Sequence, residues 1–280
     1  MHLVIQGADI ETRDLKELAK LAGAAAIDRL SATAFRLCGA QPAAGIAEFC
    51  ATARLDHGFV PEGRRLTDFR LLVMDMDSTL ITMETIDELA DMVNIKAEVA
   101  AITSQAMRGE IEYDESLRRR LALLKGLDES ALQRVYDERL KFSPGAERML
   151  AKVRAAGIKT LLVSGGFTYM TDRLKTRIQL DYTHSNVLEI INGKLTGTVI
   201  GEIVNADAKL AALRRIAADI GASKEQIAGV GDGANDLKFL AECGVSFAYH
   251  AKPVVREKTT YAINQAGLDA MLCLLSAEQE

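Results

Sequence analysis

The sequence has 280 residues, of which 49% are hydrophobic and 26% charged, and its formal net charge is −5. This length accommodates one large core, or a core with a smaller domain attached. The negative charge argues against non-specific nucleic-acid binding, which requires a basic surface, and no apolar run is long enough to span a membrane.

The cysteines show no C-x-x-C spacing, which indicates reduced core thiols rather than zinc ligands or a disulfide framework. They are Cys38, Cys50, Cys243 and Cys273. The first residues, Met1–Ile5, lack the basic stretch and apolar core of a secretory signal. We therefore expect a cytoplasmic protein.

Residues 1–70 are predicted to form a small α+β domain, because apolar residues alternate at strand and helix spacing in turn. No motif there indicates catalysis. Packing or dimerisation is the favoured interpretation, and effector binding is the alternative. The expected elements are a strand at 3–5, a helix at 12–25, a strand at 27–38, a helix at 44–55 and a linker at 61–65.

The segment Leu71–Met74 is typical of a strand buried on both faces. Asp75 and Asp77 follow at its exit, and strand alternation points both side chains the same way. Two crowded carboxylates require a cation between them or a shared proton. Helix capping explains the same Asp-Ser-Thr string. A calcium loop does not, because Leu80 and Ile86 replace its glycine and glutamate.

Residues 85–141 repeat apolar positions at helical spacing and contain no convincing strand. An all-helical insertion directly after the first core strand predicts a cap that closes over the strand ends and excludes water.

A second buried strand is expected at 158–163, followed by Ser164, Gly165, Gly166 and a helix. Glycines allow a ligand to approach the backbone, and the amides at a helix start favour an anion. An ordinary turn between a strand and a helix has the same pattern.

Asn192-Gly193 between two alternating runs predicts a hairpin within 187–200. The helix predicted at 206–220 has Lys209 near its start, where the helix dipole disfavours a cation. A solvated side chain explains this lysine, and so does a phosphate held between the helix start and the ammonium group.

A third strand at 226–230 leads into Gly231–Asp236. Its glycine spacing fits a dinucleotide-binding fingerprint. Asp232 argues against that interpretation, because it would place a carboxylate where the pyrophosphate lies. The fingerprint also normally belongs to the first βαβ unit of a chain. A metal site suits the acidic residues better.

These features predict an α/β fold with a Rossmann-like open parallel sheet as its core. The carboxyl ends of such strands share one edge, so the polar residues that follow them are expected to converge. They are Asp75, Asp77, Ser164, Lys209 and Asp232. Oxygen ligands without histidine or cysteine favour Mg²⁺.

Four ordered motifs resemble those of the haloacid dehalogenase superfamily of phosphotransferases: Asp75–Thr79, Ser164–Gly166, Lys209 and Gly231–Asp236. Further segments at 84–88, 116–120, 163–167 and 193–197 resemble the members that hydrolyse O-phospho-L-serine, the last step of L-serine biosynthesis. The match covers residues 70–265. It implies an ACT-like domain at 1–70 and a phosphatase domain at 71–280 with a helical cap at 85–141.

The resemblance also implies catalytic roles. Asp75 is expected to be the nucleophile that forms an aspartyl-phosphate, and Asp77 the general acid and base. Mg²⁺ is expected to bind Asp75, the main-chain carbonyl of Asp77 and Asp232, with Asp236 beside them. Phosphoryl contacts are implied for Ser164, the Gly165 amide, Lys209 and Asn235.

Substrate selection is implied for the cap, with Glu84 binding the substrate ammonium and Arg120 its carboxylate. Tyr113 takes the position of an aromatic residue. The implied partner is the small-molecule substrate, and a homodimer through residues 1–70 is a further expectation. Two alternatives stay open: a serine-sensing or scaffold protein with a vestigial site, and a phosphatase of other specificity, for instance towards phosphohomoserine.

Overall fold

The computed structural model describes residues 1–277. The chain divides into two compact units. One contains residues 1–72, 143–159 and the chain from 220 onward, and the other contains residues 73–142 and 160–219. The boundary that the sequence suggests at residue 70 stays a prediction. Within residues 1–277, every helix is too short or too polar to cross a membrane.

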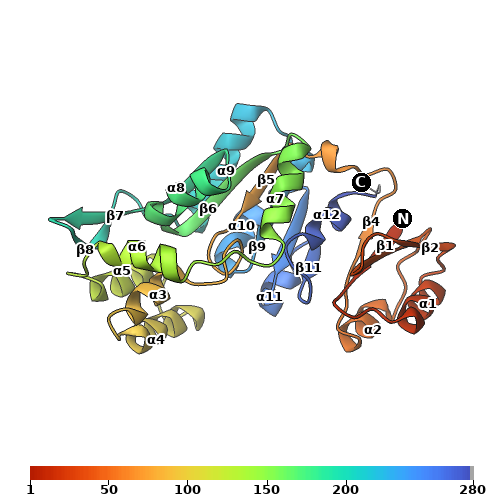
Figure 1. Cartoon of the computed structure of the whole chain (residues 1–280), viewed down its shortest axis with the longest axis horizontal. Helices are drawn as coiled ribbons and strands as arrows, with labels where there is room; N and C mark the ends of the chain where they lie inside the picture. The colour runs from red at the N-terminus through yellow and green to blue at the C-terminus, as the bar shows by residue number, and fades with distance from the viewer. Residues whose placement is uncertain (278–280) are drawn as a thin grey trace. The chain divides into compact units, whose positions relative to one another are not determined.

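The N-terminal segment folds as βαββαβ, with a four-stranded antiparallel sheet in the order β2-β3-β1-β4. Helices α1 and α2 pack on one face of this sheet (Figure 1), where Leu3, Leu18, Leu37 and Ile46 join a common apolar core. The elements are β1 (His2–Gln6), α1 (Thr12–Leu21), β2 (Ala26–Arg29), β3 (Ala34–Cys38), α2 (Ile46–Thr52) and β4 (Asp56–Val60).

Two predictions for this segment are wrong. The single strand expected at 27–38 is a hairpin, because the chain reverses at residues 30–34, where the amides of Leu30 and Ser31 donate to the Ala34 carbonyl. The expected helix at 44–55 ends at Thr52. The residues after it form β4, an edge strand that completes the sheet.

A seven-stranded sheet has the order β11-β10-β9-β5-β6-β7-β8. Strands β9, β10 and β11 pair in parallel, as do β6 and β7, whereas β7 and β8 are antiparallel. The predicted α/β fold with a mostly parallel sheet is therefore confirmed. The strands are β5 (Leu71–Met74), β6 (Lys159–Phe167), β7 (Tyr182–Ile191), β8 (Lys194–Ile200), β9 (Ile227–Gly231), β10 (Val245–Tyr249) and β11 (Tyr261–Ile263).

The hairpin of β7 and β8 forms where the sequence predicts it. Ile191 pairs with Lys194, so the turn has two residues. Asn192 and Gly193 both have positive φ, at 51° and 75°. These are the residue types and backbone angles that suit a tight turn between antiparallel strands.

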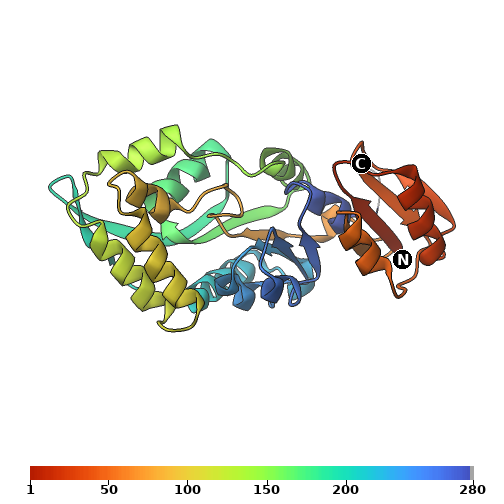
Figure 2. The same cartoon turned by 90° about the horizontal axis from the view of Figure 1, so that it is seen from below.

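Four helices follow β5 before the chain reaches α7, so the segment predicted to be helical contains helices throughout its length. They are α3 (Thr85–Asp91), α4 (Lys96–Met107), α5 (Tyr113–Leu123) and α6 (Ser130–Glu138). Helices α4 and α5 lie side by side (Figure 2).

The remaining helices precede, connect or follow the strands of the large sheet. They are η1 (Leu66–Asp68), α7 (Ala146–Ala155), α8 (Thr168–Arg177), α9 (Ala206–Ile220), η2 (Lys224–Gln226), η3 (Ala234–Asp236), α10 (Leu237–Leu240), α11 (Pro253–Arg256) and α12 (Ala270–Leu275). Helix η1 lies before β5, and α12 lies after β11. Helix α9 has the bounds that its apolar spacing predicts.

Candidate active site

Asp75 and Lys209 form a buried ion pair. All four residues of β5 are buried, and Asp75 follows directly with 6% of its surface exposed. Lys209, in the first turn of α9, is 1% exposed, and its Nζ donates to Asp75 Oδ1 at 2.7 Å. The structure therefore brings together two predicted site residues that lie far apart in the sequence.

The Asp77 carboxylate is held by Thr85 at the start of α3. Thr85 donates its main-chain N–H to Oδ2 at 3.0 Å and its hydroxyl to Oδ1 at 2.8 Å. Burial raises the pKa of Asp77 to about 7, with a further contribution from the Glu84 carboxylate, while Thr85 and the Lys209 charge oppose the rise. A carboxyl group with such a pKa can both donate and accept a proton near neutrality.

No helix begins at the Asp-Ser-Thr string itself, but the capping interpretation holds in part, because Asp77 accepts the main-chain N–H of Thr85, the first residue of α3. Helix α3 begins only at Thr85. Residues 78–84 form a loop in which Ser78 has a positive φ of 57°. This loop brings Ser78 Oγ to Glu84, to which it donates at 2.6 Å.

Strand β6 continues through the glycines to Phe167, so it is longer than the expected strand at 158–163, and the expected helix follows it. Helix α8 begins at Thr168. The Ser164 side chain is 1% exposed, and its hydroxyl oxygen accepts the Gly166 N–H at 2.8 Å. The Gly165 carbonyl accepts from Asn186 Nδ2 at 2.8 Å.

Both glycines have close neighbours, a rigid tyrosine ring at Gly165 and the flexible end of a methionine at Gly166. A Cβ on Gly165 would collide with the Tyr113 hydroxyl oxygen, and a Cβ on Gly166 would lie 2.7 Å from Met76 Cε. Tyr113 is partly buried, and this burial raises its pKa to about 12, while Lys209 and Arg120 oppose the rise. The tyrosine hydroxyl is thus neutral in the ordinary pH range and lies against the glycine backbone.

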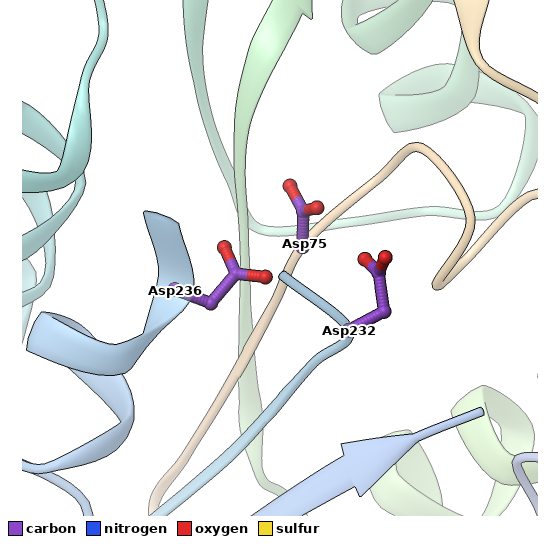
Figure 3. Close-up of side chains that lie close together, drawn as sticks. All are labelled: Asp75, Asp232 and Asp236. Atoms are coloured by element: carbon purple, nitrogen blue, oxygen red, sulfur yellow. The ribbon is translucent and has the colours of Figure 1, made fainter. Parts of the chain in front are cut away.

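Asp75, Asp232 and Asp236 form an acidic cluster, in which one carboxylate oxygen from each lies within 4.8 Å of the others (Figure 3). Asp236 is fully buried and accepts the Gly233 N–H at 3.0 Å. Gly231 makes room for it, because a Cβ there would lie 2.5 Å from Asp236 Oδ2. A donor set of carboxylates alone fits a hard divalent cation that prefers oxygen ligands.

Asp236 belongs to this cluster together with Asp75 and Asp232, whereas the sequence predicts a position beside the metal rather than bound to it. The Asp77 carboxylate accepts both bonds from Thr85, and metal binding by its main-chain carbonyl stays a prediction. Asn235 lies in η3 and is partly buried. Its side-chain oxygen occupies the space that a Cβ on Gly233 would take.

Glu84 and Arg120 come from different segments of the helical insertion. Glu84 is exposed at the surface, but neighbouring protein groups reduce the solvation of its carboxyl group and raise its pKa, while Ser78 and the charges of Arg120 and Lys209 oppose the rise. Arg120 is partly buried and donates from Nε to the Ser116 carbonyl at 3.4 Å. It forms no ion pair within residues 1–277.

Two asparagines at this site were not predicted from the sequence. Asn186 is 2% exposed and contacts the Gly165 carbonyl. Asn205 caps α9, because its Oδ1 accepts the amides of Asp207 and Ala208, and its Nδ2 donates to Asp114 of α5. Asn205 carries a recognisable signal, an asparagine directly before a helical pattern. Asn186 carries no comparable signal, since its strand mixes polar and apolar residues.

A model of the haloacid dehalogenase-like hydrolase family matches residues 72–241, more than half of the chain. The chain therefore belongs to the haloacid dehalogenase-like hydrolase family. A second model, described as a domain of unknown function (DUF4072), matches residues 3–46.

The similar proteins include phosphoserine phosphatases. A phosphoserine phosphatase of a Polaromonas strain is 50% identical over 216 residues, which cover 75% of this chain and 92% of that protein. A HAD-family hydrolase structure from Salmonella enterica serovar Typhi has a TM-score of 0.89 at 34% identity, covering 99% of this chain and 98% of its own. A probable phosphoserine phosphatase structure from Vibrio cholerae has a TM-score of 0.86 at 35% identity, covering 99% and 86%.

Proposed function

We propose that this chain is an enzyme that hydrolyses O-phospho-L-serine to L-serine and inorganic phosphate, the last step of L-serine biosynthesis. The observation that carries the proposal is the position of Asp75, which pairs with Lys209 at 2.7 Å and also belongs to the acidic cluster. A buried acid between a cation and further acids suits transfer of a phosphoryl group. The 50% identity to a phosphoserine phosphatase supports the substrate.

Asp75 is the proposed nucleophile and Asp77 the proposed acid and base. An Asp75 oxygen forms a bond to phosphorus as the bond between phosphorus and the serine oxygen breaks, and Asp77 donates its proton to that oxygen. A water then attacks the phosphorus and gives a proton to Asp77. The bond to Asp75 breaks, and phosphate leaves. The pKa of about 7 for Asp77 supports both transfers.

The phosphoryl oxygens are proposed to contact Lys209, the Ser164 hydroxyl, the Gly165 amide and Asn235. Lys209 is already buried and fixed by Asp75, so it loses little freedom when substrate binds. Fixed donors of this kind stabilise the charge that spreads over the oxygens in the transition state.

Mg²⁺ is the proposed cation, held by Asp75, Asp232 and Asp236 with the main-chain carbonyl of Asp77. Its proposed binding follows from the donor set, which consists of three carboxylates. When bound, the ion supplies positive charge that offsets the crowded acids and polarises a phosphoryl oxygen.

Glu84 is proposed to bind the substrate ammonium and Arg120 its carboxylate, with Tyr113 closing over the phosphoryl site. Arg120 forms no ion pair within the described chain, and this supports the role. Its guanidinium can bind the substrate carboxylate without first breaking an ion pair within the protein. Tyr113 already contacts Gly165.

The chain is proposed to contain two domains. Residues 1–70 are proposed to be an ACT-like domain that mediates a homodimer, and the βαββαβ order supports the first part. Residues 71–280 are the proposed phosphatase domain, in which 85–141 act as the closing cap. A cytoplasmic location is kept as a prediction.

The test is release of inorganic phosphate from a panel that contains phosphoserine, phosphothreonine, phosphohomoserine and sugar phosphates. We expect phosphoserine to have the highest kcat/KM, and activity to disappear with EDTA and return with Mg²⁺. Higher kcat/KM on another panel member would overturn the substrate assignment, and full activity after removal of divalent ions would overturn the metal assignment.

A further inference from the structure

Strand β6 contains a bulge at the proposed phosphoryl site. Val163 pairs with His184 and Phe167 with Asn186 on β7, so the residues from Ser164 to Gly166 lie opposite Ser185 alone. Extra residues in a bulge lose their regular ladder partners. Their backbone groups must therefore find hydrogen bonds elsewhere when they are buried.

Asn186 supplies one of these bonds and also holds a second segment. Its Nδ2 donates to the Gly165 carbonyl at 2.8 Å, and its Oδ1 accepts the Val204 N–H at 2.8 Å. The side chain is 2% exposed, so water does not compete strongly for these groups. The bulge is thereby tied to residue 204, immediately before the Asn205 cap of α9, the helix that carries Lys209.

The peptide between Gly165 and Gly166 is held at both ends. Asn186 binds its carbonyl oxygen, and Ser164 Oγ accepts its N–H at 2.8 Å. Because a serine hydroxyl has a single proton, the oxygen that accepts from Gly166 keeps that proton available for another acceptor. The fixed peptide therefore sets the direction in which Ser164 can donate.

We infer that Asn186 is a positioning residue of the proposed phosphoryl site: it fixes the bulge peptide that orients the Ser164 hydroxyl and adjoins the Gly165 amide, and it ties this peptide to the segment before α9. The inference rests on the proposed function for its catalytic consequence. It concerns the phosphoryl group, which every substrate shares, and not the amino-acid part of the substrate.

The test compares N186L, N186D and the control S185A in the full-length protein. N186L keeps the branched shape of the side chain, although it is bulkier, and removes both bonds, whereas N186D keeps an acceptor for Val204 and loses the donor to Gly165. Ser185 lies on the same strand, and its hydroxyl bonds to Thr171 at 2.8 Å, so S185A removes a buried hydrogen bond that does not reach the bulge.

Two readouts are measured in Mg²⁺: binding of inorganic phosphate by calorimetry, and kcat on phosphoserine and on an aryl phosphate. We expect both Asn186 variants to bind phosphate at least tenfold more weakly and to lose about 10- to 100-fold in kcat on both substrates alike. S185A should stay within about twofold of wild type in both readouts. N186D introduces a carboxylate and N186L does not. A loss of phosphate binding and kcat in both variants therefore cannot be caused by the added charge.

Unchanged phosphate binding in N186L and N186D would overturn the inference, and so would an equal loss in S185A. Melting temperatures identify a variant that fails to fold, and N186D is the milder change. If wild type binds phosphate but releases none from phosphoserine, the proposed function fails, and phosphate binding alone still decides the role of Asn186.

Discussion

Lys209 and Asp75 pair in the protein interior, with 2.7 Å between Nζ and Oδ1, although 134 residues separate them in the chain. A lysine that is 1% exposed requires a partner, since an isolated buried ammonium is strongly destabilising. The start of α9 disfavours a cation. The acid at the end of β5 provides that partner, and the pair places the proposed nucleophile beside the charge that we propose to bind the phosphoryl group.

Asp75→Asn should abolish phosphate release while the protein stays folded. The amide keeps the size of the carboxylate and can accept from Lys209, but it is a poor nucleophile towards phosphorus. We expect activity below about 0.1% of wild type, a loss of about 4 kcal/mol in transition-state stabilisation. Turnover is measured with phosphoserine and folding by circular dichroism. The control is Asp219→Asn, the same substitution at an exposed position on α9. Normal turnover by Asp75→Asn would show that Asp75 is not the nucleophile.

Arg120→Ala should impair phosphoserine hydrolysis selectively. A charge-assisted bidentate contact to the substrate carboxylate contributes about 3 kcal/mol, so kcat/KM for phosphoserine should fall about a hundredfold. An aryl phosphate lacks that carboxylate and should lose less than about threefold. The neighbouring Arg119→Ala is the matched control, because Arg119 pairs with Glu115 at an exposed position. Equal losses on both substrates would show that Arg120 does not read the amino-acid part.

Much of this site could be predicted because the residues follow recognisable strands. The apolar runs before Asp75 and Gly231 identify β5 and β9, and strand ends share an edge in an open sheet. Lys209 could be placed because its helix has clear apolar spacing. These inferences need only the direction of each strand, and they do not depend on register.

The features that the sequence could not predict depend on register or on the path of a loop. The bulge after Val163 exists only in the pairing of β6 with β7, so the role of Asn186 is invisible in the chain itself. The bonds from Thr85 to Asp77 require the path of residues 78–84. The hairpin of β2 and β3 was missed because its turn contains no glycine, asparagine or proline to interrupt the alternation.

Gly165→Ala should impair the enzyme through Tyr113. The added methyl group would collide with the tyrosine hydroxyl, so one of the two segments must shift, at a cost of about 1–3 kcal/mol. We expect a lower melting temperature and at least tenfold lower kcat on every substrate, since the backbone at the phosphoryl site moves.

The double variant Gly165→Ala with Tyr113→Phe tests the cause. Removing the hydroxyl oxygen opens the space that the methyl group needs, so the double variant should recover more than half of the lost stability. Tyr113→Phe alone measures what the hydroxyl contributes. No recovery in the double variant would mean that Gly165 is required for a reason other than contact with Tyr113.

Asp56→Ala should destabilise the protein without changing its chemistry. The Asp56 side chain, at the start of β4, is 2% exposed and accepts the main-chain amides of Asn264, Gln265 and Ala266 at 2.8–2.9 Å. Its removal leaves three amides without their acceptor, so the free energy of unfolding should fall by about 3 kcal/mol. Urea denaturation measures the change, with the exposed Asp9→Ala as the control. Since Asp56 touches none of the proposed site residues, kcat/KM at 25 °C should stay within about twofold of wild type. If the free energy of unfolding falls by less than about 1 kcal/mol, these three bonds are not a main source of stability for β4.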